Sequence, residues 1–177
     1  MVCPSALAFI LNNPVRRALT DRHAVIAESH IDKKSIVLEV GAGNGFFTEV
    51  LVHEAKKVYA VELQSGMIRK LRKRIPASAD NVEIIEMHIA DLELVPGIVD
   101  VAFFYYAFHE VDNQEKAAEK TGRAVRKGGW LSLYEPRVEV SAAMMESSVA
   151  MFEKTGFVRE AGRESFFTRF AGLRKER

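Results

Sequence analysis

The stretch that decides the fold reads Ile36-Val37-Leu38-Glu39-Val40-Gly41-Ala42-Gly43-Asn44-Gly45. Its first five residues are largely apolar and predict a buried strand over 36–40. Three glycines follow at alternate positions, and residues 46–55 then carry apolar side chains at helical spacing. Because glycine has no Cβ, the chain can turn sharply there and bring its backbone against a ligand, next to the free N–H groups of a helix start. The stretch therefore predicts a strand, a binding turn and a helix.

Strands and helices alternate along the rest of the chain. Further strands are predicted at 58–62, 82–87, 99–105 and 130–135, with helices at 65–75, 112–126 and 141–154 between and after them. This alternation of four strand–helix–strand units predicts a doubly wound α/β fold, with a mostly parallel sheet covered by helices on both faces. Ligands are expected at the carboxyl ends of the strands.

The ends of several elements carry specific expectations. Ser65 is expected to cap its helix, and Asp112 with Glu115 to form a capping box. Lys127-Gly128-Gly129 is expected to stop the helix before the fifth strand, and Gly162 to break residues 157–173 into two antiparallel strands. The helix at 141–154 is expected to bury the apolar residues Met144, Met145, Val149 and Phe152.

Composition restricts the class of protein. The chain has 177 residues with a formal net charge of +1, which predicts one domain over 1–177 and gives no overall field that favours nucleic acid. A single cysteine excludes an internal disulfide framework and favours a reducing, cytoplasmic location. The apolar run at 5–11 is too short to span a membrane and is expected to pack as a short helix. Residues 1–30 are interpreted as a helical extension, with a helix starting at Pro14.

Acidic residues near the ends of the first three strands indicate the ligand. Glu39 lies in the first strand, where a buried carboxylate would repel a pyrophosphate but attract an ammonium or sulfonium group. Glu62 ends the second strand, where a carboxylate can accept both ribose hydroxyls. Asp91 follows the third strand, where it can accept an adenine amino hydrogen. S-adenosylmethionine carries all of these groups.

The glycine spacing argues against the main rival cofactor. A dinucleotide fingerprint has the form G-x-G-x-x-G and needs glycine at position 46, which is Phe46. The sequence has G-x-G-x-G instead. An NAD-dependent oxidoreductase therefore remains the second hypothesis, and a non-catalytic cofactor-binding module the third.

At this point the chain resembles the class I S-adenosylmethionine-dependent methyltransferases. Five segments carry the resemblance, which covers roughly residues 30–173: 37–48, 59–63, 89–92, 100–111 and 126–131. The family implies a seven-stranded sheet of order 3-2-1-4-5-7-6 with strand 7 antiparallel. It also implies that S-adenosylmethionine is held by Glu39, Gly41, Ala42, Gly43, Asn44, Gly45, Glu62, Leu63, Ala90, Asp91, Leu92 and Tyr105.

The acceptor of the methyl group is less well determined. Residues 37–91 are similar to ribosomal RNA adenine dimethylases, but those enzymes carry an Asn-Leu-Pro-Tyr/Phe type motif at strand four, where this chain reads Phe104-Tyr105-Tyr106-Ala107-Phe108. A small-molecule acceptor is therefore favoured over RNA or protein. The fourth strand points at the methyl group in this fold, so Tyr105 and His109 are the candidate catalytic residues. Tyr106, His109 and Glu135 are the candidate substrate contacts.

Other polar residues are assigned no chemistry. Methyl transfer releases a neutral leaving group, so alignment and exclusion of water are expected to matter more than acid catalysis. The remaining histidines show no ligand spacing, and no metal is expected. The basic run over 69–74 is interpreted as a solvated helix face rather than a nucleic-acid site. The N-terminal helices, including Phe9, Arg16 and Arg17, can form a lid over the cofactor; the oligomeric state is left open.

Overall fold

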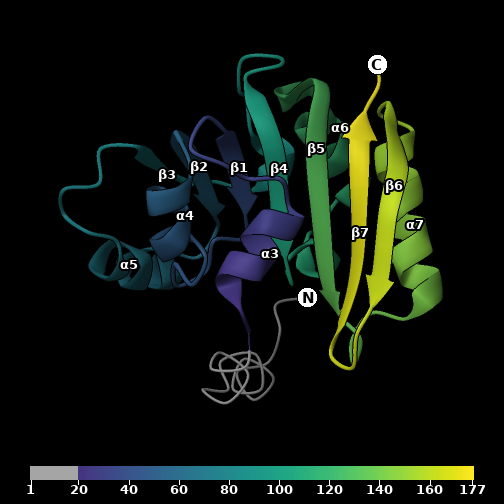
Figure 1. Cartoon of the computed structure of the whole chain (residues 1–177), viewed down its shortest axis with the longest axis horizontal. Coiled ribbons are helices and arrows are strands. Elements are labelled where there is room, and N and C mark those ends of the chain that lie inside the picture. Colours follow the sequence, from purple (N-terminus) through teal and green to yellow (C-terminus); the bar gives the residue numbers. More distant parts are fainter. Residues whose placement is uncertain (1–19) are drawn as a thin grey trace.

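The computed structural model describes residues 20–177 (Figure 1). The expectations for the run at 5–11, for the helix start at Pro14 and for a lid containing Phe9, Arg16 and Arg17 lie outside the described residues. The elements in chain order are α3 (Arg22–Glu28), β1 (Ile36–Val40), α4 (Thr48–Glu54), β2 (Lys57–Glu62), α5 (Ser65–Arg74), β3 (Val82–Glu86), the 3-10 turn η1 (Ile89–Asp91), β4 (Val99–Tyr105), the 3-10 turn η2 (Phe108–Glu110), α6 (Gln114–Ala124), β5 (Val125–Pro136), α7 (Ala142–Glu153), β6 (Phe157–Glu164) and β7 (Thr168–Lys175).

The strands form one seven-stranded sheet in the order β3-β2-β1-β4-β5-β7-β6. The pairs β1–β2, β2–β3, β1–β4 and β4–β5 are parallel, while β7 runs antiparallel to both β5 and β6. The predicted doubly wound fold, its strand order and its antiparallel strand 7 are confirmed. The carboxyl ends of β1, β2, β4 and β5 therefore meet at one edge of the sheet.

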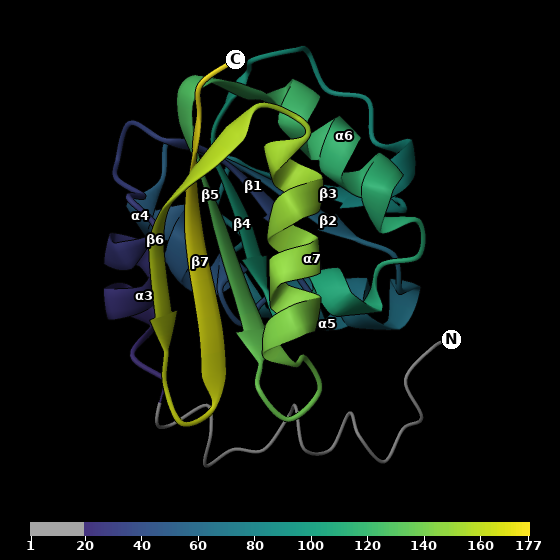
Figure 2. The same ribbon diagram turned by 90° about the vertical axis from the view of Figure 1, so that its right-hand side faces the viewer.

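Helices cover both faces of the sheet, α3, α4 and α5 on one and α6 and α7 on the other (Figures 1 and 2). Successive residues of β4 alternate between the two cores, as a strand between two helical layers requires. Val101 and Phe103 pack with α4 and α5, whereas Ala102 and Phe104 pack with α6 and α7. All four side chains are buried, which explains why this strand reads as a continuous apolar run.

Two predicted helix caps are wrong. The cap of α5 is Gln64, with no side-chain hydrogen bond, and Ser65 is already the first helical residue. The cap of α6 is Asn113 in the left-handed conformation, with its side chain accepting from the Lys116 N–H. Glu115 is therefore one position too early to complete a capping box with the true cap. Asparagine tolerates the left-handed region better than most residues, and this explains the shift of one position.

Three expectations about the C-terminal part also fail. Strand β5 begins at Val125 and includes Gly128 and Gly129, so the helix α6 ends at Ala124 before the glycines. Gly162 lies inside β6, and the turn between β6 and β7 falls at 165–167 instead. Met144 is exposed on α7, while Met145 takes the core position.

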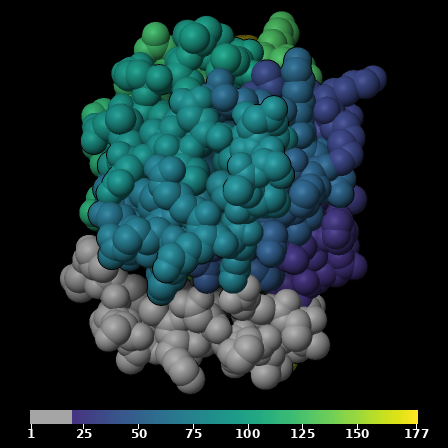
Figure 3. Space-filling model, turned by 90° about the vertical axis from the view of Figure 1, so that its left-hand side faces the viewer, coloured from purple at the N-terminus to yellow at the C-terminus, as the bar shows by residue number. Residues whose placement is uncertain are grey.

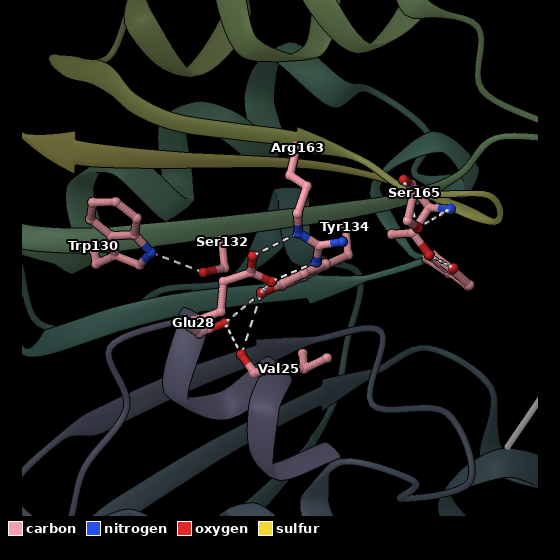
Figure 4. Close-up of polar contacts among 10 residues, drawn as sticks. Val25, Glu28, Trp130, Ser132, Tyr134, Arg163 and Ser165 are labelled. Carbon is pink, nitrogen blue, oxygen red and sulfur yellow. Dashed lines mark hydrogen bonds and ion pairs between the residues drawn. The ribbon is translucent and has the colours of Figure 1, made fainter. Parts of the chain in front are cut away.

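A polar network connects α3 to the far half of the sheet (Figure 4). The Tyr134 hydroxyl of β5 donates to Glu28 at 2.9 Å, and Arg163 of β6 binds both oxygens of the same carboxylate, each at 2.9 Å. A two-point arginine–carboxylate pair fixes orientation better than a single contact. The network therefore fixes α3 against β5 and β6. Among the described residues, no helix is long and apolar enough to cross a membrane.

Candidate functional site

The glycine loop between β1 and α4 is folded back on the sheet. The N–H groups of Gly41 and Ala42 donate to the Val61 carbonyl of β2 at 2.9 and 3.1 Å. Gly41, Gly43 and Gly45 all have positive φ, at 71°, 56° and 81°, a region that side chains with a Cβ disfavour. A Cβ on Gly41 would lie 2.5 Å from the Ala107 Cβ, whereas one on Gly43 would meet only a carbonyl oxygen 3.9 Å away. The loop is thus packed tightly at Gly41 and open at Gly43.

Glu39 lies buried under this loop. One of its carboxylate oxygens accepts from the Thr48 hydroxyl, the first residue of α4, at 2.7 Å. Burial raises the Glu39 pKa to about 8, against the hydrogen bond from Thr48 and with a further contribution from the charge of Glu62. A carboxyl group in such a place is stabilised in its charged form by a nearby cation.

Glu62 connects the carboxyl end of β2 to the loop. Its two oxygens accept from the backbone N–H groups of Gly43 at 2.8 Å and Gln64 at 2.7 Å. A carboxylate oxygen has more than one acceptor site, so each keeps capacity for a hydroxyl. The next residue, Leu63, is 58% exposed although it is large and apolar. Asn44 accepts from Arg74 at 3.2 Å, which joins the loop to α5.

The segment after β3 differs from the prediction in detail. Asp91 lies in the turn η1 and is exposed, with its carboxylate 2.9 Å from the Lys116 ammonium. That pair lowers the Asp91 pKa, through the hydrogen bond and the charge of Lys116. Ala90 and Leu92 on either side are both 4% exposed, and Leu92 belongs to the core next to α6.

Aromatic side chains gather where β4 ends. The Tyr105 ring stacks on Tyr106 with centroids 4.4 Å apart and lies 4.5 Å from the Phe47 ring at the start of α4. Tyr106 has φ of 57°, unusual for a residue with a bulky side chain, and its N–H donates to the Tyr134 carbonyl at 2.8 Å. Its hydroxyl contacts Thr168 at the start of β7.

His109 and Glu135 form a pair across the ends of β4 and β5. The Glu135 side chain is fully buried and one of its oxygens accepts from the N–H groups of Phe108 at 3.0 Å and His109 at 3.2 Å. Its other oxygen contacts His109 Nδ1. Burial alone would lower the His109 pKa, but the hydrogen bond to Glu135 and the charges of Glu135, Glu110 and Glu139 outweigh it and raise that pKa.

Two further carboxylates face the other nitrogen of His109. Glu139 Oε2 lies 3.3 Å from His109 Nε2, and Glu110 Oε1 lies 4.0 Å from it. Neither of these glutamates, nor Thr48, is among the site residues predicted from the sequence. Glu139 follows Glu135 by four positions. That spacing places two side chains on one face of a helix, but it indicates nothing about their proximity in a loop. His109 and Glu135, two of the predicted substrate contacts, lie against each other, whereas Asp91 lies with Lys116 of α6.

A surface hollow lies elsewhere. It measures about 460 Å³ and runs along the exposed face of α5, lined by Gln64, Gly66, Met67, Arg69, Lys70 and Lys73. Figure 3 looks onto this end of the molecule, where the residues of α5 and β3 form the surface. The hollow begins next to Glu62 but does not include the glycine loop.

Comparison with known proteins identifies a family. Residues 38–133 match the family model described as "Methyltransferase domain", which is more than half of the chain. An uncharacterized methyltransferase of Geobacillus is 33% identical over 96 residues, covering 53% of this chain and 44% of that protein. A probable ribosomal RNA small subunit methyltransferase A of Methanosarcina mazei is 44% identical over 61 residues, covering 34% of this chain and 22% of that protein. The chain thus spans less than half of the length of these two curated relatives.

The fold also matches a solved structure over almost its whole length. The crystal structure of an S-adenosylmethionine-dependent methyltransferase from Aquifex aeolicus superposes with a TM-score of 0.83 and 22% sequence identity. The alignment covers 98% of this chain and 99% of that one. At this level of identity the likeness establishes the fold.

Proposed function

This chain belongs to the class I S-adenosylmethionine-dependent methyltransferases, and we propose that it transfers the methyl group of that cofactor to a small-molecule acceptor. When bound, S-adenosylmethionine would supply an electrophilic methyl group: the acceptor atom would bond to the methyl carbon as the sulfur leaves as a neutral thioether. The observation that carries the proposal is the glycine loop, which is open at Gly43 and lies over the buried Glu39 and beside Glu62.

These residues fit the cofactor's chemistry. Glu39 is buried without a cationic partner among the described residues, and its raised pKa reflects that environment. A positive ligand group above it would stabilise the carboxylate. Glu62 is held by two backbone N–H groups and keeps acceptor capacity for ribose hydroxyls. The exposed Leu63 offers an apolar surface to an adenine ring, and Asp91 a carboxylate to its amino group.

The acceptor is assigned to the carboxyl ends of β4 and β5. Tyr105 and Tyr106 form an aromatic wall there, and Tyr105 contacts Phe47 at the start of α4, next to the glycine loop. His109 lies at the same end of β4, with its ring oriented by the contact of Nδ1 with Glu135. Such a wall excludes water and aligns the acceptor with the methyl group, which is the main contribution a methyltransferase must make.

Cofactor binding is tested by calorimetry with S-adenosylmethionine and with NAD. We expect binding of the first and none of the second. Glu62→Gln is expected to weaken S-adenosylmethionine at least tenfold. The matched control is Glu86→Gln, because Glu86 pairs with Glu62 in register at the end of β3 and is exposed. Tight binding of NAD without S-adenosylmethionine, or equal effects of the two variants, would overturn the proposal.

RNA is the second candidate acceptor, on one observation. Helix α5 carries Arg69, Lys70, Arg72 and Lys73 on its exposed face, and the ion pairs found among residues 20–177 include none of these four. The relative from Methanosarcina mazei is named as a ribosomal RNA methyltransferase. Incubation with methyl-labelled S-adenosylmethionine and fractionated extract decides between the two. Label in small molecules supports the first candidate, and label in RNA that is lost in a Lys70→Glu/Lys73→Glu variant supports the second.

A further inference from the structure

Three donor atoms converge between the ends of β4 and β5. They are His109 Nε2, one oxygen of Glu110 and one oxygen of Glu139, and all lie within 4.8 Å of one another. The distance from Nε2 to Glu139 Oε2 is 3.3 Å and that to Glu110 Oε1 is 4.0 Å. Ligands around one metal ion at about 2.0–2.2 Å from it stand at similar separations. Two short turns, η2 and the loop after β5, bring these residues together.

The imidazole is already oriented as a metal-binding histidine is. The buried carboxylate of Glu135 contacts Nδ1, so that Nε2 is the nitrogen that faces Glu110 and Glu139. Histidines that bind metals commonly use their second nitrogen in this way, because a carboxylate there fixes the ring and increases its basicity. The Glu135 oxygens also accept two backbone N–H groups, so the supporting carboxylate is itself held in place.

The cluster also has unused acceptor capacity and surplus negative charge. Glu139 Oε1 is buried and has no hydrogen-bond partner within residues 20–177. Glu28, by contrast, faces a cationic partner, Arg163, at 2.9 Å. Over the same residues, the ion pairs of Glu110, Glu135 and Glu139 all involve His109. Three carboxylates around one imidazole leave a net negative charge even when the ring is protonated.

We propose that His109, Glu110 and Glu139 bind a divalent transition-metal ion. The donor set selects this class, because an imidazole nitrogen suits zinc, iron or nickel better than magnesium or calcium, which prefer oxygen ligands alone. Glu110 is partly exposed, and three protein ligands leave positions open on that side. One consequence rests on the proposed methyl transfer: the bound ion would select acceptors that have an oxygen or nitrogen atom able to bind it.

The experiment measures metal binding directly, without an activity assay. The full chain is treated with a chelator and dialysed against micromolar Zn²⁺, and bound metal is counted per chain, with Mg²⁺ as a comparison. We expect about one Zn²⁺ per chain and little Mg²⁺. His109→Gln and Glu139→Gln are expected to lower Zn²⁺ affinity at least tenfold, and Glu135→Gln, which leaves the ligands in place, by about 10-fold or more.

Two controls separate this site from other zinc ligands. His23→Gln removes an exposed histidine that also faces a carboxylate, Glu54, at 3.9 Å. Cys3→Ser removes the single thiol. Both are expected to retain the bound metal, and Zn²⁺ is expected to raise the melting temperature of both controls but not of His109→Gln. Failure to bind Zn²⁺ below 1 mM, or loss of binding in the controls but not in His109→Gln, would overturn the proposal.

S-adenosylmethionine binding is measured on the same preparations. It confirms that Glu139→Gln is folded, and it separates the two proposals. Cofactor binding without zinc binding contradicts the metal site alone. Zinc binding without cofactor binding contradicts the proposed function and leaves the metal site standing.

Discussion

The two halves of the sheet edge are built in different ways. On the β1–β2 side, which we propose binds the methyl donor and call the donor side, the site consists of backbone geometry: three glycines with positive φ and a carboxylate held by loop N–H groups. On the β4–β5 side, which we propose binds the acceptor and call the acceptor side, it consists of side chains: stacked tyrosines and a histidine among three carboxylates. We propose that backbone geometry binds the cofactor here and that side chains select the acceptor. The comparison predicts that variants on the two sides affect different measurements.

The largest effect is expected at Gly41, where the two sides touch. Gly41→Ala places a Cβ 2.5 Å from that of Ala107 at φ of 71°. Overpacking costs about 1–3 kcal/mol and the left-handed backbone about 1–2 kcal/mol, so we expect a loss of about 3 kcal/mol in the free energy of unfolding, measured with urea. Adding Ala107→Gly should recover the packing part only. Full recovery would show that backbone strain contributes nothing.

The next effect is expected at Glu135 on the acceptor side. Glu135→Ala leaves two buried N–H groups and the His109 ring without their acceptor, and a loss of about 2–4 kcal/mol in unfolding free energy should follow. Glu135→Gln should lose less, because it keeps an acceptor oxygen. S-adenosylmethionine affinity should change less than threefold in Glu135→Gln. A loss comparable with that in Glu62→Gln would contradict the separation of the two sides.

Cofactor binding on the donor side should be coupled to the release of a proton from Glu39. With a pKa of about 8 in the free protein, the carboxyl is mostly protonated at pH 7. A cationic ligand above it lowers that pKa, so binding at pH 7 should release most of one proton. Calorimetry in two buffers of different ionisation enthalpy measures the release. Glu39→Gln should abolish it, and an unchanged release in this variant would assign the proton to another group.

The same carboxyl affects stability with a definite sign. Its pKa rises from an ordinary value of 4.5 to about 8 on folding, so between these values the native state holds a proton that the unfolded chain has lost. The free energy of unfolding should therefore fall as pH rises from about 5 to 8, by about 1 kcal/mol per pH unit. Urea unfolding at three pH values tests this: Glu39→Gln should remove that part of the slope.

The smallest effect is expected at Asp91. Its carboxylate is exposed and already paired with Lys116, so Asp91→Asn should weaken S-adenosylmethionine binding by less than about threefold, far less than Glu62→Gln. Lys116→Met, which removes the partner, should leave the affinity unchanged or slightly higher. A tenfold loss of S-adenosylmethionine affinity in Asp91→Asn would contradict this expectation, because it would show that the carboxylate contributes strongly to binding.

The contrast between the two sides also explains what could be predicted from sequence. The strand, glycines and helix over 36–54 are contiguous, and the ribose-type acid Glu62 follows at the next strand end. Local pattern and fold topology were therefore enough to place them at one edge. The strand order, by contrast, follows from the family resemblance, and the structure confirms it.

The acceptor side depends on contacts between residues distant in sequence. His109 and Glu135 are 26 positions apart, and Glu139 is 30 positions from His109. Nothing local distinguishes Glu139 from the other acids, and its proximity to His109 becomes visible only when the loop after β5 is placed beside η2. The cap of α6 differs from the prediction for a local reason: Asn113 adopts the left-handed backbone that asparagine tolerates, and it caps the helix in place of Asp112.

The order of strands has a consequence for how this protein is made on the ribosome. Strand β7 lies between β5 and β6, although it is the last of the seven to be synthesised. Until residues 168–175 emerge, β6 lacks the neighbour with which it pairs and β5 keeps an unpaired edge. Phe170, Ala171 and Leu173 are buried in the finished sheet. The nascent chain therefore cannot complete its sheet before residues 168–175 have been synthesised, and both cores stay incomplete until then.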